Sequence, residues 1–242
     1  MTPKQNRGAG KKRPPAVPLN YYDLRAEQRK SDLFFVFCNG KITEKEYFTQ
    51  LSKDLANKSI RSQFCYVEFV HGAPKQIVQY VHDYVTDRKR NTSKNDIENN
   101  DIVWVVFDKD DFGKNYSDAV RLAEQSHIAE QPHINVAYSN ICFELWLLLH
   151  FQEQTAPITQ ARLTELLRRK WEEVADCTIE RQKKVKHFPY GIIRSYGDRN
   201  LAMERAENLY NTATQKCPET PWEIDPVTNV YQLVKALQNF FS

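Results

Sequence analysis

The chain has 242 residues, of which 41% are hydrophobic and 12% aromatic, and its formal net charge at pH 7 is only +3. This composition excludes a disordered protein, and the small net charge is unlike that of a nucleic-acid coat protein. No apolar run approaches the roughly 20 residues that a membrane helix needs, and the first residues lack the apolar core of a signal peptide. We therefore expect a soluble protein with no membrane segment.

The N-terminal region changes character near residue 31. Residues 1–30 combine basic residues with proline and glycine and show no periodic apolar pattern, so we expect a flexible basic tail. The apolar run Leu33–Cys38 then predicts a first strand, and Asn39-Gly40 predicts a tight turn out of it. A helix should follow, because Thr43 and Glu46 have the spacing of a capping box.

Strand and helix patterns alternate from residue 64 to residue 151. Strands are expected at 64–70, 102–106 and 134–138, and helices at about 75–89, from 117 onward and at 141–151, with an exposed polar loop at 90–100. The last of these helices should be capped by Ser139 or Asn140. Such alternation predicts an α/β domain over 31–151 with a mainly parallel sheet flanked by helices.

Beyond residue 151 the pattern becomes helical. Helices are expected at about 159–175, 198–215 and 227–240, and no segment there gives a convincing strand signal. We therefore expect a C-terminal helical subdomain over 152–242.

The cysteine pattern favours a cytoplasmic protein. The number of cysteines is odd, and none belongs to a Cys-x-x-Cys pair, so we expect reduced thiols and no cysteine-ligated zinc site. The five cysteines are Cys38, Cys65, Cys142, Cys177 and Cys217.

Three carboxylates directly follow the predicted central strand, in the segment Phe107–Phe112. Ligands of open α/β sheets bind just past the carboxyl ends of the strands, and Asp108 and Asp110 should point to the same side. A shared Mg²⁺ or Mn²⁺ would relieve the repulsion between these two carboxylates. The alternative is a solvated turn in which the acids cap the backbone and Gly113 makes the bend.

A single acid, Glu144, interrupts the strongly apolar helix predicted at 141–151. A buried carboxylate costs several kcal/mol unless it is paired or bound to a cation. Its partner is either an ordinary one, such as a basic side chain or the helix N-terminus, or the metal or catalytic centre near Asp108. His150, at the end of the same helix, is expected to be a structural histidine with satisfied hydrogen bonds.

Two short basic runs lie in the helical region. Arg181, Lys183, Lys184 and Lys186 are followed by aromatic residues, which suits contact with nucleic-acid phosphates and bases. The other run is Arg168-Arg169-Lys170. For both runs the alternative is an ordinary solvated face.

Several separated segments resemble the RloB-like proteins. They are residues 35–44 with Tyr47-Phe48, residues 103–110, residues 136–151 and the Asp-Pro-Val-Thr-Asn-Val segment at 225–230. The most specific of them is the Ser-Asn-Ile-Cys-Phe-Glu-Leu-Trp motif at 139–146. The resemblance covers the chain from about residue 31 to its end.

This resemblance implies a Toprim-like domain, in which acids after two strands assemble a Mg²⁺- or Mn²⁺-dependent site for phosphoryl transfer. It matches Asp108 and Asp110 to the metal-binding pair, and Glu44 and Glu144 to acids of the family motifs. It also implies a nuclease effector of bacterial anti-phage defence, connected with abortive infection and often encoded beside an ABC-type ATPase.

The chain departs from the family pattern Cys-Glu-Gly-Glu-Lys-Thr-Glu at two positions. Asn39 replaces the Glu identified with the Toprim general acid or base, and Lys41 replaces the second Glu. A carboxamide can bind Mg²⁺ but cannot transfer a proton, a step that contributes about 10²–10⁴-fold to catalysis. The site would then be inactive, or weakened if metal-bound water or Glu44 supplies the proton transfer. Lys41 would either contact the scissile phosphate or face solvent.

These observations leave three hypotheses open. The first is a Mg²⁺-dependent nuclease acting on RNA or DNA. The second is a catalytically depleted regulatory subunit that binds nucleic acid or a protein partner, which Asn39 and Lys41 favour. The third is a phosphotransferase or phospho-acceptor on a doubly wound sheet. The chain has no Gly-x-x-x-x-Gly-Lys-[Ser/Thr] loop, which argues against its being the ATPase itself.

Overall fold

The computed structural model of the protein describes residues 33–59, 64–86, 101–126, 133–175 and 190–242. The predicted tail at 1–30 and the predicted loop at 90–100 lie outside the described residues. Among the described residues, no helix combines the length and apolar character that crossing a membrane requires.

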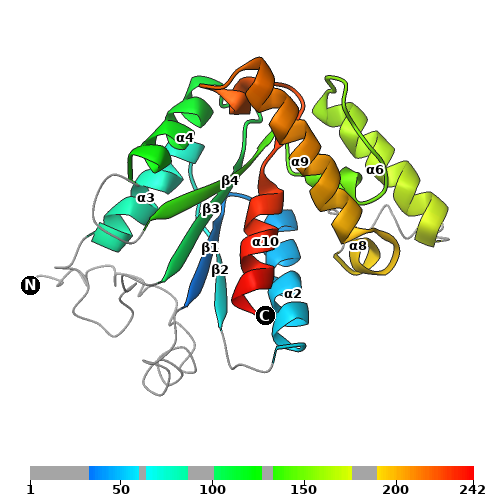
Figure 1. The fold of residues 1–242 in the computed structure, drawn as a ribbon, viewed down its shortest axis with the longest axis horizontal. Helices are drawn as coiled ribbons and strands as arrows, with labels where there is room; N and C mark the ends of the chain where they lie inside the picture. Colours follow the sequence, from blue (N-terminus) through cyan, green and yellow to red (C-terminus); the bar gives the residue numbers. More distant parts are fainter. Residues whose placement is uncertain (1–32, 60–63, 87–100, 127–132, 176–189) are drawn as a thin grey trace, which may run out of the picture.

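A five-stranded sheet in the order β2-β1-β3-β4-β5 forms the centre of the fold, which confirms the predicted α/β class (Figure 1). The first four strands along the chain are parallel, and β5 is antiparallel to β4. Every residue of β1 is buried, as expected for an apolar strand in the interior of a parallel sheet. The strands are β1 (Phe34–Cys38), β2 (Cys65–Phe69), β3 (Ile102–Asp108), β4 (Ile134–Asn140) and β5 (Val227–Thr228).

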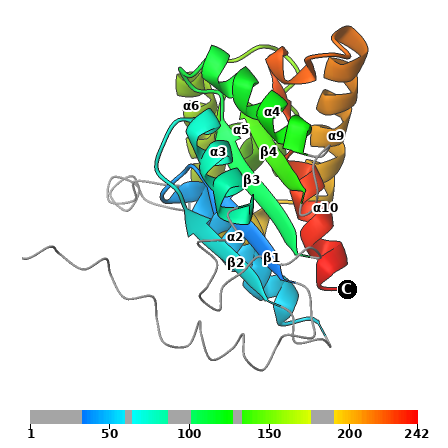
Figure 2. The same ribbon diagram turned by 90° about the vertical axis from the view of Figure 1, so that its left-hand side faces the viewer.

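Helices cover both faces of this sheet, with α3 and α4 on one face and α2 and α10 on the other (Figures 1 and 2). Of the remaining helices, α5, α6, α8 and most of α9 pack on the second side, whereas Ala213 of α9 and Trp222 of η1 belong to the core on the first. Residues of the same strand alternate between the two apolar cores, because successive side chains of a strand point to opposite faces. The helices are α2 (Thr43–Ala56), α3 (Pro74–Thr86), α4 (Lys114–Ser126), α5 (Glu144–Leu149), α6 (Gln160–Ala175), α8 (Tyr190–Tyr196), α9 (Arg199–Lys216), the 3-10 turn η1 (Pro221–Glu223) and α10 (Val230–Phe240).

The region beyond residue 151 contains a strand, so the expectation of helices alone was wrong there. Val227 and Thr228 pair with the end of β4, where the last helix was expected to begin, and α10 starts only at Val230. Two residues are too few to show the alternation by which a strand is recognised. α10 packs on the sheet itself, with the rings of Phe34 and Phe240 5.3 Å apart. Described residues on both sides of position 151 therefore share one apolar core.

Helix α8 was also absent from the prediction. It has only seven residues and is joined to α2 by polar contacts. The Tyr190 hydroxyl donates to Asp54 (3.0 Å), and Arg194 forms an ion pair with the same carboxylate (3.1 Å). Tertiary contacts of this kind leave no periodic signal in the sequence.

Two predicted helix caps are wrong. α2 begins at Thr43 without a side-chain capping bond, and Glu46 instead accepts from the Tyr190 N–H (3.4 Å). Ser139 and Asn140 are the last residues of β4, and α5 starts later, at Glu144. Their side chains instead form hydrogen bonds with Trp222, Ile224 and Thr228 of the C-terminal segment. These long-range bonds take the place of a local cap on α5.

Candidate functional site

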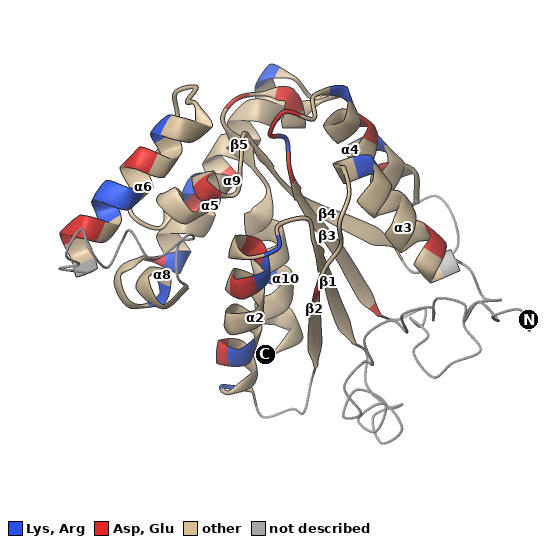
Figure 3. Cartoon of the chain, turned by 180° about the vertical axis from the view of Figure 1, so that it is seen from behind, with Lys and Arg blue, Asp and Glu red and all other residues tan. Residues whose placement is uncertain are grey.

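Four carboxylates from three segments gather at the carboxyl end of the central strands. Asp108 is the last residue of β3, Asp110 lies in the loop after it, Glu44 is in the first turn of α2, and Glu144 opens α5. The acidic loop after β3 is visible in red at the upper end of the sheet in Figure 3. This is the edge at which open α/β sheets bind their ligands.

Backbone bonds hold the acidic loop in place. The N–H of Lys109 donates to the carbonyl of Ser139 (3.0 Å), and the N–H of Asp110 donates to that of Ile141 (3.0 Å). Asp110 has a φ of 38°, in the left-handed region that few residues other than glycine adopt, although Asp is among the more tolerant. The loop is therefore fixed against the start of the segment that leads into α5.

Asp108 joins β3 to α5. Its Oδ2 accepts from the backbone N–H of Phe143 (2.8 Å), whereas its Oδ1 is buried without a hydrogen-bond partner among the described residues. Burial raises the pKa of this carboxyl well above its usual range, and the charges of Glu44, Glu144 and Asp110 add to the effect. An unpartnered buried oxygen of this kind calls for a ligand, an ion or a proton.

Glu44 is almost completely buried, with 8% of the residue exposed. Burial is the main reason that its pKa rises from 4.5 to about 7, and the charges of Glu144 and Asp110 contribute. Its carboxylate lies over Gly40, where a Cβ would overlap the carboxylate oxygens. Glycine at position 40 therefore makes room for the Glu44 side chain.

The pKa of Asp110 is also raised, first by desolvation and then by the charges of Glu144 and Asp111. None of the four carboxylates takes part in an ion pair within the described residues. Either a proton or a cation would relieve the resulting repulsion.

Asn39 and Lys41 differ from these acids in their surroundings. The Asn39 Nδ2 donates to the carbonyl of Gly72 (3.2 Å), in the loop between β2 and α3, and its backbone N–H bonds to Val106 (2.8 Å). Lys41 is exposed in the loop between β1 and α2. The structure thus brings Glu44, Asp108, Asp110 and Glu144 together. The Asn39 carboxamide instead forms a hydrogen bond with the loop between β2 and α3.

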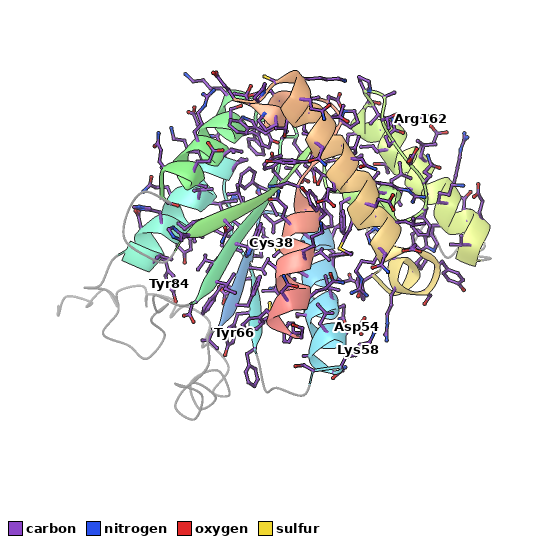
Figure 4. The ribbon with its side chains drawn as sticks, in the orientation of Figure 1. Cys38, Asp54, Lys58, Tyr66, Tyr84 and Arg162 are labelled. Atoms are coloured by element: carbon purple, nitrogen blue, oxygen red, sulfur yellow. The ribbon has the colours of Figure 1, made fainter. Side chains whose placement is uncertain are left out.

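The two thiols beside the acids are not suited to nucleophilic chemistry. Cys38, labelled near the centre of Figure 4, is fully buried at the end of β1, and burial and Glu44 raise its pKa. Burial raises the pKa of Cys142 as well, with contributions from Glu144 and Asp108. A reactive cysteine needs a lowered pKa, so these residues serve as packing.

His150 has the structural role expected for it. Its Nδ1 donates to the carbonyl of Trp146 (3.0 Å), which leaves Nε2 to accept from the Tyr47 hydroxyl (3.3 Å). Burial lowers its pKa to about 4, so the ring is neutral near pH 7.

The turn η1 contributes residues that sequence reasoning missed. Glu223 forms an ion pair with Lys109 (3.3 Å), the residue between Asp108 and Asp110, and also bonds to Ser117. Asn140 Nδ2 donates to the carbonyls of the flanking residues Trp222 (3.2 Å) and Ile224 (2.9 Å). No local pattern marks these contacts, because the partners are separated by 82 to 114 positions.

The predicted nucleic-acid contacts Arg181, Lys183, Lys184 and Lys186 lie outside the described residues. The other basic run is part of α6, where Arg169 pairs with Glu165 and Lys170 pairs with Glu173 (2.7 Å). Alternating basic and acidic patches are visible along α6 in Figure 3. This run is therefore a solvated helix face with internal ion pairs.

The four carboxylates suit a hard divalent cation in their chemistry. Mg²⁺ prefers oxygen ligands and is usually held by one or two carboxylates, with water completing the coordination. Within the described ranges, no group of three or more His, Cys, Asp and Glu side chains is arranged to hold a metal ion. The residues therefore fit a cation bound through a pair such as Asp108 and Asp110, and not one enclosed in a cage of protein ligands.

Comparison with known families identifies the chain. A family model described as RloB-like protein matches residues 34–237, which run from the start of β1 into α10. A search of curated proteins and a search of solved structures found no match. Because the family match covers most of the chain, including the sheet, the acidic loop and α5, the protein belongs to the RloB-like protein family.

Proposed function

We propose that this protein is a Mg²⁺-dependent nuclease of the Toprim type, a cytoplasmic effector of bacterial anti-phage defence that acts on RNA or DNA. The observation that supports the proposal is the convergence of four carboxylates at the carboxyl edge of the sheet. Within the described residues none of them forms an ion pair, and Oδ1 of Asp108 is buried without a hydrogen-bond partner. An ABC-type ATPase encoded alongside is the proposed partner.

The reaction would be hydrolysis of a phosphodiester bond, in which water attacks phosphorus and the bond to the leaving oxygen breaks. Asp108 and Asp110 would hold the cation, which would neutralise charge on the phosphate and polarise it. Glu44 has a pKa of about 7 and can exchange a proton near neutral pH, as general acid–base catalysis requires. Lys41, which is exposed in the loop before α2, would contact the scissile phosphate.

Cleavage assays on the full chain test this proposal. A single-stranded RNA, a tRNA and a plasmid DNA are each incubated with Mg²⁺, with Mn²⁺ or with EDTA. We expect metal-dependent cleavage of at least one of them, reduced at least about 100-fold in Asp108→Asn, because metal-ion catalysis supplies several kcal/mol. This substitution keeps an oxygen that can accept from the Phe143 N–H, so the link to α5 is retained.

The matched control is Asp83→Asn, at an exposed acid on α3. Its activity should equal that of the parent. Calorimetric titration with Mn²⁺ should in addition show weakened binding by Asp108→Asn and unchanged binding by Asp83→Asn. Equal Mn²⁺ affinity in all three proteins would show that the acids form a turn without a metal role.

A catalytically depleted regulatory subunit is the second candidate. The observation that favours it is Asn39, which stands where the family pattern has a titratable Glu and whose carboxamide bonds to Gly72. This candidate predicts Mn²⁺ and nucleic-acid binding without cleavage of any of the three substrates.

A further inference from the structure

Two of the large apolar side chains that are exposed in the described part of the chain lie on loops of the candidate functional site. Phe112 follows Asp110 by two residues, and Ile42 precedes Glu44 by two. Their exposed fractions are 39% and 45%, and neither residue belongs to either apolar core. Two residues of chain span at most about 7 Å, so each of these apolar residues lies close to an acid of the site.

The backbone holds Phe112 in a well-defined turn. Its N–H donates to the carbonyl of Lys109 (2.8 Å), and its own carbonyl accepts from the N–H of Asn115 (2.9 Å). The ring, in contrast, contacts no other aromatic ring among the described residues. A turn that fixes the backbone and leaves the ring unpacked is preorganised for a ligand, because little conformational entropy is lost on binding.

Two lysines accompany these apolar residues. Lys114 is exposed at the first position of α4, and Lys41 is exposed in the loop before α2. Because α4 and α2 cover opposite faces of the sheet, the loops that carry the lysines flank the carboxylates from both sides (Figures 1 and 2). Neither lysine forms an ion pair within the described ranges. A cation in the first turn of a helix opposes the helix dipole, so Lys114 does not stabilise α4 in this way.

An exposed aromatic ring with lysines on both sides suits a single strand of nucleic acid. A base stacks on the ring, and the lysines contact phosphates of the strand. In a duplex the faces of the bases are stacked on their neighbours, so a protein ring reaches a base only after the base leaves the stack, which costs free energy. The lysines favour such a polyanion over the apolar surface of a protein partner.

We propose that Phe112 stacks on an unpaired base next to the bound phosphate and that Lys114 contacts a neighbouring phosphate, so that the site accepts a single strand and rejects a fully paired duplex. Ile42 would contact the strand from the other loop. The inference rests on the proposed function, because the cation assigned to Asp108 and Asp110 offsets the acidic charge that a phosphate meets there. RNA and DNA share the base and phosphate chemistry of this contact.

Fluorescence anisotropy with two labelled strands tests the stacking contact. One is a short single strand, and the other has the same phosphates but an abasic residue in place of every nucleotide. The full chain is measured in Mg²⁺ with Asp108→Asn as the parent, which slows cleavage and removes one acidic charge. Phe112→Ala should weaken binding of the strand with bases about five- to 150-fold, the usual range for one stacked base, and leave binding of the abasic strand unchanged. Phe112→Tyr keeps a ring and should bind like the parent.

Tyr196→Ala is the matched control. Tyr196 is 55% exposed, and its ring contacts no other aromatic ring in the part of the chain that the structure describes. It ends α8, in which Arg194 pairs with Asp54, roughly 15 Å along α2 from Glu44. Binding of both strands should be unchanged in this variant.

A second pair of variants tests the phosphate contact. Lys114→Gln should lower the slope of log affinity against log salt by about 0.7, the value for one phosphate contact of a single strand. Lys216→Gln, at an exposed position of α9, is its control and should leave the slope unchanged. In cleavage assays with Asp108 restored, the single strand should be cut faster than its fully paired duplex, and Phe112→Ala should reduce this preference.

The outcomes separate this inference from the nuclease function. If Phe112→Ala loses no affinity, or loses it equally for the two strands, the inference is overturned, even where Mg²⁺-dependent cleavage is found. Cleavage of the duplex at least as fast as that of the single strand, or failure of the parent to bind either strand, overturns it as well. Base-dependent binding through Phe112 without cleavage by the chain that retains Asp108 would support the contact and contradict the nuclease function.

Discussion

At the scale of single residues, the acids of the site are unusual because of burial and mutual repulsion. Asp108 has one oxygen bonded to Phe143 and the other without a partner in the part of the chain that the structure describes, and Glu44 is buried above Gly40. In the absence of a cation, both carboxyls hold protons more tightly than they would in water. Proton uptake and cation binding are therefore alternative ways of stabilising the same site.

The pH dependence of stability should reveal Glu44. Its folded pKa of about 7 lies above its ordinary value of 4.5, so the folded state binds the proton more tightly than the unfolded chain. The stabilisation is fully present below about pH 4.5 and is lost as the pH rises through about 7, by up to about 3 kcal/mol. In EDTA, Glu44→Gln should gain stability relative to the parent between pH 5 and pH 8, measured by urea denaturation.

The variant must be compared with the parent at each pH, because the titration of His150 changes the stability of the protein with pH in the opposite direction. Its folded pKa of about 4 is below its ordinary value of 6.5, so it destabilises the protein as the pH falls through this range. This contribution is common to both proteins and cancels in their difference. Glu204→Gln, at an exposed position on α9, is the control. A pH-independent difference between Glu44→Gln and the parent would contradict the prediction.

Asn39→Glu should raise Mg²⁺-dependent cleavage by about one to four orders of magnitude, the range of a positioned proton-transfer group. The new carboxylate cannot donate to the carbonyl of Gly72, as the Nδ2 of Asn39 does, so it loses the bond that engages the present side chain. Expression of the variant should also become toxic. Initial rates of RNA and DNA cleavage provide the measurement.

Asn39→Gln is the matched control for this substitution. It has the length of Glu but no titratable group, so it should show no gain in rate. If Asn39→Glu binds Mn²⁺ and cleaves neither RNA nor DNA, the loss of a proton-transfer group does not explain the departure from the family pattern. The regulatory-subunit hypothesis would then be preferred.

At the scale of elements, the short strand β5 and the turn before α10 complete the edge of β4. The backbone N–H of Tyr138 donates to Asn229 Oδ1 (2.6 Å), and Asn229 Nδ2 donates to the carbonyl of Val136 (2.9 Å). β5 pairs only with Ser139 and Asn140, and the buried side chain of Asn229 supplies backbone hydrogen bonds to the preceding part of β4 that a longer strand would otherwise make. It also connects the C-terminal segment to the strand that leads into the candidate site.

Asn229→Ala should lower the free energy of unfolding by about 2–4 kcal/mol, because it removes the partner of the buried Tyr138 N–H and of the partly buried Val136 carbonyl. Urea denaturation followed by tryptophan fluorescence measures the change. Asn229→Asp should also be destabilising, because its carboxylate keeps the acceptor for Tyr138 but places a buried charge against the carbonyl of Val136. Asn211→Ala, at an exposed position of α9, is the control. Equal stability of the two alanine variants would contradict the structural role of Asn229.

At the scale of the whole molecule, the question is where a nucleic acid would bind. Acidic residues dominate the edge of the sheet, and the run Arg168-Arg169-Lys170 on α6 is largely engaged in ion pairs. The basic run that includes Lys183, Lys184 and Lys186 remains the predicted phosphate-binding segment. Such contacts contribute affinity that depends on salt and not on sequence.

Neutralising Lys183, Lys184 and Lys186 together to Gln should weaken nucleic-acid binding to a similar extent for different sequences. The slope of log affinity against log salt should fall by about 0.7–0.9 for each lysine that contacts a phosphate. Fluorescence anisotropy at several salt concentrations gives this slope. The control is a triple variant on α6 that removes the same number of positive charges. It combines Arg168→Gln, Arg169→Gln and Lys170→Gln. Equal slopes for the two triple variants would assign Lys183, Lys184 and Lys186 to a solvated surface.

The sequence by itself determined the parallel part of the sheet. The strands β1 and β3 are apolar runs, up to the final Asp108 of β3, because both faces of a central parallel strand are covered by helices. The same local pattern placed Asp108 and Asp110 at the end of β3, since acids that directly follow a buried strand must lie at the edge of the sheet. Burial and periodicity are local properties, and they can be read from neighbouring residues.

Only the tertiary structure decided which distant groups meet. The pairing of β5 with β4, the ion pair of Glu223 with Lys109 and the hydrogen bond from the Phe143 N–H to Asp108 all join residues that are far apart along the chain. Ser139 and Asn140 have the chemistry of helix caps, yet their side chains bond across the sheet edge instead. Such choices depend on the competition between local and long-range partners, which is resolved only when the chain is packed.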